Sequence, residues 1–320
     1  MNKYIENGET FLKNCLFDGL AHSYDVVTGE YVKPYPEVTG YVIKYFCDNC
    51  NGSGMSKIQE AGVYLCSIQH KTGGYKTFYD NRYLYAFDTA QILNGLISLS
   101  KCFNNNEINC AIDKAGEFLL NMQRKDGAIY PVYDTYLFTK RMPKKMYPMW
   151  NGATSGLLCK VTEVYNEMYI VTGDKRYNEA VKLAVEFYKT SEPLTYTHPL
   201  GYWLEGLYAG GMEDFVCSFL KNNVISRIED NGFIPYTYGL DYSYTSGEAQ
   251  LAILMVKCGF IKEAVKIREF IRNVQRNHIS GGIFQFSNRE AGLDNHIHTE
   301  INSWGTKYYC ELERLMEDYE

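Results

Sequence analysis

The chain has 320 residues, 46% of them hydrophobic, and a formal net charge of −6. This composition is enough for one large core or two ordinary ones, and the acidic balance argues against a surface that binds nucleic acid through its phosphates. No stretch approaches 18 uninterrupted apolar residues, and the N-terminus lacks the apolar segment of a signal peptide. We therefore predict a globular cytoplasmic protein without a membrane span, whose ten cysteines stay reduced.

Amphipathic segments with helical periodicity recur six times along the chain. Several end in a glutamine that is followed by a glycine turn and an aromatic run, as at 69–75, 123–130 and 275–284, with a weaker copy at 230–235. A glycine after a helix supplies the left-handed residue of a C-cap. The six segments cover residues 4–16, 56–69, 107–123, 176–190, 213–226 and 260–276.

A second kind of helix, apolar on most sides and therefore predicted to be buried, alternates with these segments. The second helices start near residues 39, 88, 154, 199, 246 and 303, which is a spacing of roughly 53 residues per repeat. Six such pairs predict an all-α fold, an (α/α)6 toroid in which one helix of each pair faces the hub. No linker divides the chain, so residues 1–320 are predicted to form a single α/α-toroid domain.

Residues 47–54, CDNCNGSG, have the C-x-x-C-x-G-x-G spacing of a zinc knuckle. A structural zinc site needs four ligands, usually from two such pairs, and the sequence contains no second C-x-x-C. Most other cysteines lie in apolar helical patterns, where a free cysteine behaves as a small hydrophobic residue. We interpret the segment as a turn between two helices, and we assign no metal ligand and no cofactor.

Residues 114–127, KAGEFLLNMQRKDG, resemble the Q-x-x-x-G repeats of prenyltransferase and squalene-cyclase-like toroids. The phrases YPEVTGYVI (35–43), FDTAQILNGLI (87–97), THPLGYWLEGL (197–207), TSGEAQLAI (245–253) and NSWGTKYYCEL (302–312) are similar to toroid proteins found with bacterial surface-polysaccharide genes. They are also similar to glucuronyl epimerases and unsaturated glucuronyl hydrolases. The resemblance implies the toroid fold and a carbohydrate-active enzyme of bacterial surface-polysaccharide metabolism.

The turns that lead into the inner helices of a toroid meet at one end of its hub. In this sequence those turns are rich in tyrosine, carboxylates and amides, and these groups suit a cavity that stacks on sugar rings and bonds their hydroxyls. We therefore expect a saccharide or glycan as the partner. The predicted substrate-binding residues are Glu37, Tyr79, Arg82, Tyr85, Trp150, His198, Tyr202, Tyr242, Asn302, Trp304 and Lys307.

The predicted catalytic residues are Asp88, Asp241, Glu248 and His298. Carboxylates that converge on one cavity repel each other, so the pKa of at least one should rise, which suits a general acid. The leading hypothesis is glycoside hydrolysis, with Asp88 paired with Asp241 or Glu248. A helix cap explains Asp88 equally well, and Asp241 and Glu248 could instead complement a helix dipole.

Three alternatives to hydrolysis remain open. A tyrosine with a nearby histidine could be the base and acid of a uronate epimerase or lyase, with Arg82 or Lys307 holding the carboxylate. The chain could also be a non-catalytic glycan-binding toroid or a terpenoid cyclase-like enzyme, although the D-x-D-D segment of squalene-type cyclases is absent. A P-loop, a dinucleotide turn and a G-x-S-x-G elbow are absent too. The sequence specifies neither the sugar nor the oligomeric state.

Overall fold

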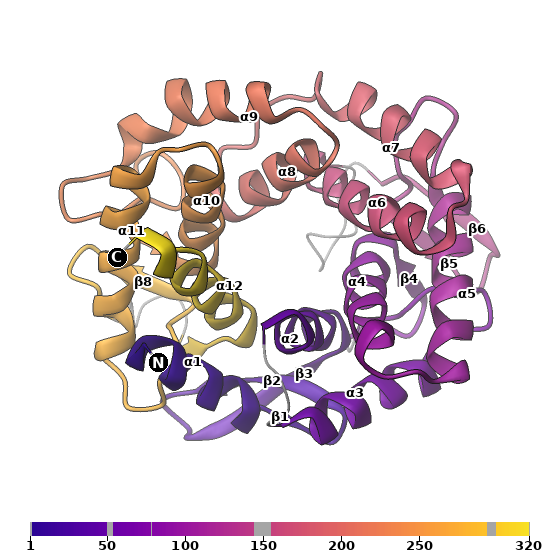
Figure 1. Ribbon diagram of the computed structural model, residues 1–320, viewed down its shortest axis with the longest axis horizontal. Coiled ribbons are helices and arrows are strands. Elements are labelled where there is room, and N and C mark those ends of the chain that lie inside the picture. The colour runs from indigo at the N-terminus through magenta and orange to yellow at the C-terminus, as the bar shows by residue number, and fades with distance from the viewer. Residues whose placement is uncertain (1, 50–53, 78, 144–154, 293–298, 320) are drawn as a thin grey trace.

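The helices alternate between an outer and an inner ring (Figure 1). The computed structural model describes residues 2–49, 54–77, 79–143, 155–292 and 299–319. The outer helices are α1 (Lys3–Asn14), α3 (Met55–Ser67), α5 (Asn106–Met122), α7 (Lys175–Tyr188), α9 (Glu213–Phe219) and α11 (Ile261–Arg276). The inner helices are α2 (Pro36–Asn49), α4 (Ala86–Cys102), α6 (Val161–Thr172), α8 (Thr197–Ala209), α10 (Thr245–Lys257) and α12 (Ser303–Leu315). The predicted (α/α)6 toroid is confirmed.

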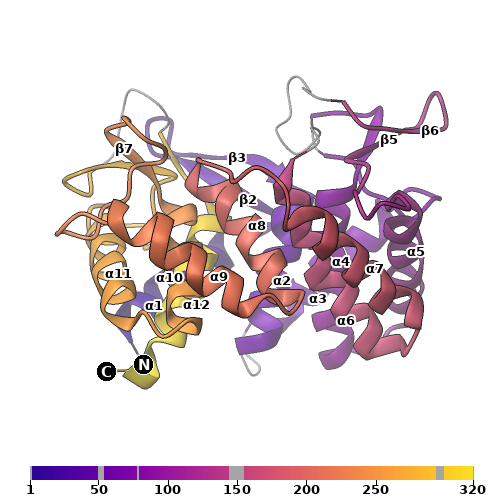
Figure 2. The same ribbon diagram turned by 90° about the horizontal axis from the view of Figure 1, so that it is seen from above.

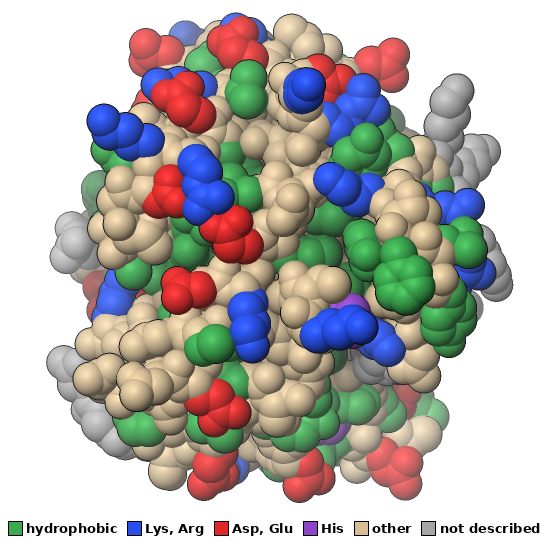
Figure 3. Space-filling model, turned by 90° about the vertical axis from the view of Figure 1, so that its right-hand side faces the viewer, with side chains coloured by type: hydrophobic (Ala, Val, Ile, Leu, Met, Phe, Trp, Pro, Cys, Tyr) green, Lys and Arg blue, Asp and Glu red, His purple; other side chains and the backbone are tan. Residues whose placement is uncertain are grey.

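The two rings differ in burial as their sequence patterns predict. In the inner helix α4 every residue from Ala86 to Leu99 is buried, and in α10 every residue from Thr245 to Val256. The outer helix α5 buries only one face, which includes Ile108, Ala115 and Leu119. An inner helix packs between its neighbours and the hub, whereas an outer helix keeps a polar face toward water. The side of the ring in Figure 3 carries intermixed acidic and basic side chains.

The recurring glutamine and glycine join consecutive outer helices. The Gln123 amide donates to the carbonyl of Gly127 in its own turn and to that of Ala180 in α7, at 3.4 and 2.8 Å. Gly127 has φ +91°, and a Cβ at this position would overlap the carbonyl oxygen of Leu183. Only glycine therefore lets the turn lie against α7.

The same contact closes the ring. The Gln275 amide at the end of α11 donates to the carbonyl of Tyr4 in α1, at 3.0 Å, and to that of Gly281. Gly281 also has a positive φ and lies against the backbone of Asn7. The motif that spaces neighbouring repeats thus also joins the last repeat to the first.

Short antiparallel strands lie on one side of the helices, away from the two chain ends (Figure 2). The strands β2 and β9 pair Tyr24 with Ile301, which connects the first repeat to the last. Each strand lies in a segment that leads from an outer helix to the next inner helix. Together the strands form the rim of one end of the hub. They are β1 (Leu16–Phe17), β2 (Leu20–Asp25), β3 (Glu30–Tyr35), β4 (Tyr83–Tyr85), β5 (Val132–Asp134), β6 (Thr139–Arg141), β7 (Tyr242–Tyr244), β8 (Phe286–Asn288) and β9 (Glu300–Ile301).

The prediction that all cysteines are reduced is wrong for one pair. Cys217 in α9 and Cys258 at the end of α10 form a disulfide with a Cα–Cα distance of 5.3 Å. The two positions are 41 residues apart, and only the packing of the fifth helix pair brings them together. In the C-x-x-C segment Cys47 belongs to the last turn of α2, so the predicted turn does not begin before Asn49, and Cys50 is outside the described residues. Within the described ranges, no helix is long and apolar enough to cross a membrane.

Candidate functional site

A cavity of about 290 Å³ opens at the strand-bearing end of the hub. Its walls come from the first turns of the inner helices and from the segments before them, because each inner helix begins at this end. Aromatic rings form much of the wall, and a few polar groups lie among them, which is typical of small-molecule sites. The lining residues are Lys33, Tyr35, Glu37, Val38, Tyr79, His198, Pro199, Tyr202, Tyr236, Tyr244, Gln285 and Trp304.

Two buried carboxyl groups lie at one wall of this cavity. Glu37 is in the first turn of α2 and lines the cavity, and Asp88 is beside it in the first turn of α4. Burial, together with the charge of Asp88, raises the pKa of Glu37 well above its usual range. The same surroundings raise the pKa of Tyr79 to about 12. A carboxyl group whose pKa is raised in this way holds its proton more tightly than an exposed one, which suits a proton donor.

His198, in the first turn of α8, contributes a proton acceptor to the same cavity. Burial lowers the pKa of His198 to about 3, so the imidazole is neutral at neutral pH. The ring stacks on Tyr244 with centroids 4.8 Å apart, and its centroid is 4.5 Å from that of Tyr202. A neutral imidazole held by packing in this way can accept a proton.

A hydrogen-bonded chain determines which nitrogen of His198 is basic. The Glu205 carboxylate only accepts hydrogen bonds, so the Gln250 group that faces it at 2.9 Å is the amide nitrogen. The Gln250 oxygen then faces Nδ1 of His198 at 2.5 Å, and Nδ1 must carry the hydrogen. Lys160, 3.0 Å from Glu205, balances the carboxylate charge. The lone pair of the imidazole is therefore on Nε2.

The structure brings together five of the residues that the sequence assigned to substrate binding. Four of them come from three different inner helices and one from a loop, and all face the hub at one end. Asp88, from the catalytic set, lies directly behind this wall beside Glu37. The five that line the cavity are Glu37, Tyr79, His198, Tyr202 and Trp304.

The predicted pairing of Asp88 with Asp241 or Glu248 does not form in this arrangement. The Asp241 side chain is 92% exposed, and it pairs with Arg289 at 3.2 Å on the outside of the molecule. Glu248 is fully buried but does not line the cavity. Both residues lie near the start of α10, and neither faces the space that Glu37 faces.

Glu248 has a structural position that threonine occupies in three other repeats. Each of these threonines is the fourth residue of an inner helix, and its hydroxyl accepts a hydrogen bond from the backbone N–H two residues after a turn glycine. They are Thr39, Thr89 and Thr306. Glu248 is the fourth residue of α10 and accepts the N–H of Ile234 at 2.9 Å in the same way. Its other oxygen contacts the Ser243 hydroxyl at 3.0 Å.

The remaining predicted residues that the structure describes lie away from the cavity. Arg82 forms an ion pair with the buried Asp134 at 2.8 Å, so its charge is already balanced. The Tyr85 hydroxyl donates to Asp80, and Asn302 caps the N-terminus of α12. Tyr242 packs on Phe286, and Lys307 lines a different cavity at the other end of the hub. Trp150 and His298 lie outside the described residues.

Seven residues of the cavity lining are not among the predicted site residues: Lys33, Tyr35, Val38, Pro199, Tyr236, Tyr244 and Gln285. Tyr236 and Gln285 each stand four residues after a turn glycine with positive φ, Gly232 and Gly281. Aligning the repeats on that glycine would have found both. Within the described ranges no three His, Cys, Asp or Glu side chains are grouped so as to hold a metal ion.

No family model matches the chain, and no curated protein matches it in sequence. Solved structures match it over nearly its whole length. A cellobiose 2-epimerase from Bacillus thermoamylovorans B4167 has a TM-score of 0.77 and 11% identity, with 99% of this chain and 100% of that chain covered. A D-mannose isomerase has a TM-score of 0.73 and 13% identity, with 99% and 97% covered.

A third match agrees with the resemblance noted in the sequence. An unsaturated glucuronyl hydrolase specific for heparin has a TM-score of 0.51 and 13% identity, with 99% of this chain and 97% of that chain covered. At these identities the likeness concerns the fold. The chain is thus an (α/α)6 toroid similar in fold to sugar epimerases and to a glucuronyl hydrolase.

Proposed function

We propose that the chain is a carbohydrate-active enzyme that epimerises or isomerises a saccharide by general acid–base catalysis. The observation that carries this proposal is the position of Glu37 and His198 in one cavity, where burial raises the pKa of the carboxyl group and lowers that of the imidazole. The tyrosine rings around them can lie on the apolar faces of a sugar. The fold likeness to a cellobiose 2-epimerase and a D-mannose isomerase supports the same class.

In this proposal Nε2 of His198 removes a proton from the carbon beside a sugar carbonyl, and Glu37 gives its proton to the carbonyl oxygen. The negative charge that develops on the substrate stabilises the imidazolium, which raises the pKa of His198 while the proton moves. Gln250 keeps Nδ1 as the donor and so directs Nε2 at the substrate. Lys33, which is paired with Glu300 at the rim, supplies a cation for the substrate to approach.

Hydrolysis of a glycoside is the second candidate. It is favoured by the closeness of Glu37 and Asp88, two carboxyl groups of which one keeps its proton. The catalytic pair is then Glu37 with Asp88 in place of Asp88 with Asp241 or Glu248. The polar groups among the rings of the lining support a saccharide over an isoprenoid, which calls for a wholly apolar pocket. A role in cytoplasmic surface-polysaccharide metabolism remains a prediction from the resemblance.

The test is incubation of the protein with a panel of neutral and uronic saccharides in D₂O, followed by NMR. Epimerisation or isomerisation gives a new sugar with the same number of residues and deuterium at the carbon that lost its proton. Hydrolysis gives two shorter sugars without carbon-bound deuterium. No product from any saccharide would contradict the catalytic proposal and leave a binding toroid.

Variants assign the roles once a substrate is found. Glu37→Gln and His198→Asn are each expected to lower kcat at least about 100-fold, because each removes one proton carrier. Asp113→Asn, on the exposed face of α5, is the matched control for loss of a carboxylate. A comparable loss in Asp241→Asn, with Glu37→Gln fully active, would contradict the assignment of the acid.

A further inference from the structure

A second cavity, of about 630 Å³, lies at the opposite end of the hub. All six repeats contribute to its lining through their inner helices or the turn just before α6, and most of these residues lie in the middle or the last turns of the helices. The cavity falls within the size range of ligand pockets in proteins. Two of its residues, Glu205 and Lys160, also belong to the chain that orients His198, and the others have no part in the chemistry proposed for the strand-bearing end.

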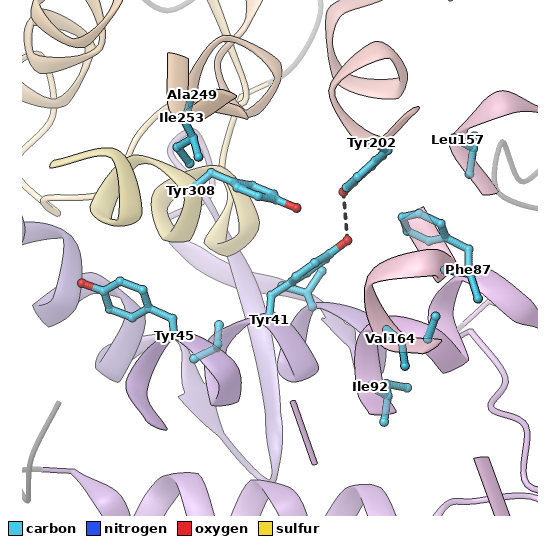
Figure 4. Close-up of a cluster of buried hydrophobic side chains, with 14 of the residues drawn as sticks. Tyr41, Tyr45, Phe87, Ile92, Leu157, Val164, Tyr202, Ala249, Ile253 and Tyr308 are labelled. Carbon is cyan, nitrogen blue, oxygen red and sulfur yellow. Dashed lines mark hydrogen bonds between the residues drawn. The ribbon is translucent and has the colours of Figure 1, made fainter. Parts of the chain in front are cut away.

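The side chains of Tyr41, Tyr202 and Tyr308 come together in the hub (Figure 4). The Tyr41 hydroxyl donates to that of Tyr202 at 3.1 Å. Tyr202 lines the first cavity, whereas Tyr41 and Tyr308 line the second. The second cavity is therefore a separate compartment and not a deeper part of the first.

Most charged groups of the second cavity already have a charged partner. Lys44 contacts Asp48 and Lys307 contacts Glu311, both at 2.8 Å, and Lys160 contacts Glu205 at 3.0 Å and also Glu163. Except at Lys257, which is exposed at the end of α10, a charged ligand would have to separate an existing pair at a cost in buried charge. An uncharged ligand can instead donate to the carboxylates and accept from the ammonium groups without breaking any pair.

Several buried polar atoms of this lining have no partner among the described residues. They are both amide atoms of Gln91, which is 1% exposed, the Asn94 carbonyl oxygen and the Tyr308 hydroxyl. Buried polar groups in folded proteins almost always form hydrogen bonds. Together these atoms offer donors as well as acceptors, beside the rings of Tyr41, Tyr208 and Tyr308.

From these features we propose that this end of the hub is a second binding site, for an uncharged polyhydroxylated ligand such as a neutral mono- or disaccharide. The hydroxyl groups of such a ligand both donate and accept, so they match the amides and the paired charges alike. The tyrosine rings match its apolar faces. The site binds independently of any reaction at the strand-bearing end.

Ligand-observed saturation-transfer NMR can test this site without an assay of turnover. The ligands are neutral mono- and disaccharides, one uronic acid and inorganic phosphate. Lys257→Trp and Ala209→Trp place a large ring at the end of α10 or α8 and so obstruct the second cavity. Pro199→Trp is the matched obstruction of the first cavity. Far-UV circular dichroism and thermal melting verify that each variant is folded.

The proposal requires that a neutral saccharide still binds Pro199→Trp, and that its affinity falls at least tenfold in Lys257→Trp or in Ala209→Trp. Binding that is lost in Pro199→Trp alone would overturn the second site. Binding of only the uronic acid or phosphate by Pro199→Trp would overturn the ligand class, and binding of no ligand by the wild type would overturn the site altogether. A failure of the catalytic proposal leaves these outcomes unchanged, because none of them depends on turnover.

Discussion

Burial prepares Glu37 and His198 for opposite tasks by one physical effect. A group removed from water favours its neutral form, so an acid keeps its proton and an imidazole loses one. Glu37 thereby becomes a proton donor and His198 a proton acceptor in the same cavity. Burial is the largest cause of both shifts, and the charge of Asp88 adds to it only for Glu37, which explains why no charge pattern in the sequence marks Glu37 and His198 as a pair.

The pH dependence of kcat/KM should reflect these two shifts. Because the pKa of His198 is lowered to about 3, we expect no loss of activity near pH 6.5, where an ordinary histidine becomes protonated. Activity should fall on the alkaline side, as Glu37 loses its proton at a raised pKa. Steady-state kinetics from pH 4 to pH 10 measures this. An acidic limb centred near pH 6.5 would contradict the role of His198.

The stability of the fold should depend on pH through Glu248. Burial raises the pKa of Glu248 from 4.5 to about 8, so between these values the folded chain holds a proton that the unfolded chain releases. Rising pH then favours unfolding, and the free energy of unfolding should fall from about pH 4.5 through pH 8. Glu248→Gln keeps an acceptor for Ile234 and should flatten this slope in urea denaturation. An unchanged slope would show that Glu248 is not the titrating group.

The glutamine and glycine turn is the element that sets the spacing of the ring. Its glutamine bonds two carbonyls, one in its own turn and one in the next outer helix, as Gln69 does with Gly73 and Ala111. Its glycine lets the turn backbone touch that same helix. The sequence shows the motif because it repeats, but the partner on the next helix has no fixed sequence signal.

Gly127→Ala should cost much more stability than an alanine at an unrestricted glycine. Gly173→Ala is the matched control, since Gly173 has φ +69° and no atom near the position of a Cβ. The control should lose about 1–2 kcal/mol for its left-handed backbone, and Gly127→Ala at least about 2 kcal/mol more for the overlap with Leu183. Urea denaturation of both variants gives the comparison. Equal losses would show that the close approach has no energetic role.

The molecule as a whole is held as a closed ring, and its ends are joined by several independent contacts. Arg272 in α11 makes two hydrogen bonds, each of 2.7 Å, to the buried Glu313 in α12. Asn2 before α1 donates to the same carboxylate at 3.0 Å. Together with the pairing of β2 with β9, these contacts prevent the first and last repeats from separating.

The disulfide should stabilise the fifth helix pair. Cys217 and Cys258 are 41 residues apart in the sequence. A cross-link over this separation lowers the entropy of the unfolded chain, which predicts a stabilisation of the fold by about 4 kcal/mol. The double variant Cys217→Ser/Cys258→Ser should therefore unfold at lower urea concentration than the wild type under oxidising conditions. Cys110→Ser, at an exposed free cysteine, is the control. If a reductant leaves the wild-type midpoint unchanged, the disulfide does not contribute to stability.

Local sequence patterns were sufficient to predict the six helix pairs, the division into outer and inner helices and the end of the hub at which the cavity opens. These features depend on local periodicity and on turn chemistry that repeats, so each copy strengthens the interpretation of the others. Five of the eleven predicted substrate-binding residues line the cavity for the same reason.

Which polar side chains at the helix starts face the cavity depends on how the inner helices pack in three dimensions. Neighbouring residues of a helix point about 100° apart. Thr89 therefore accepts a hydrogen bond from the N–H of Tyr75 in a loop, while the adjacent Asp88 lies beside Glu37. At the start of α10 Glu248 accepts the corresponding hydrogen bond, from the N–H of Ile234. Asp241, four residues before the helix, points to solvent. The rotation of each inner helix about its axis is set by packing against its neighbours in the ring, and no local sequence pattern encodes it.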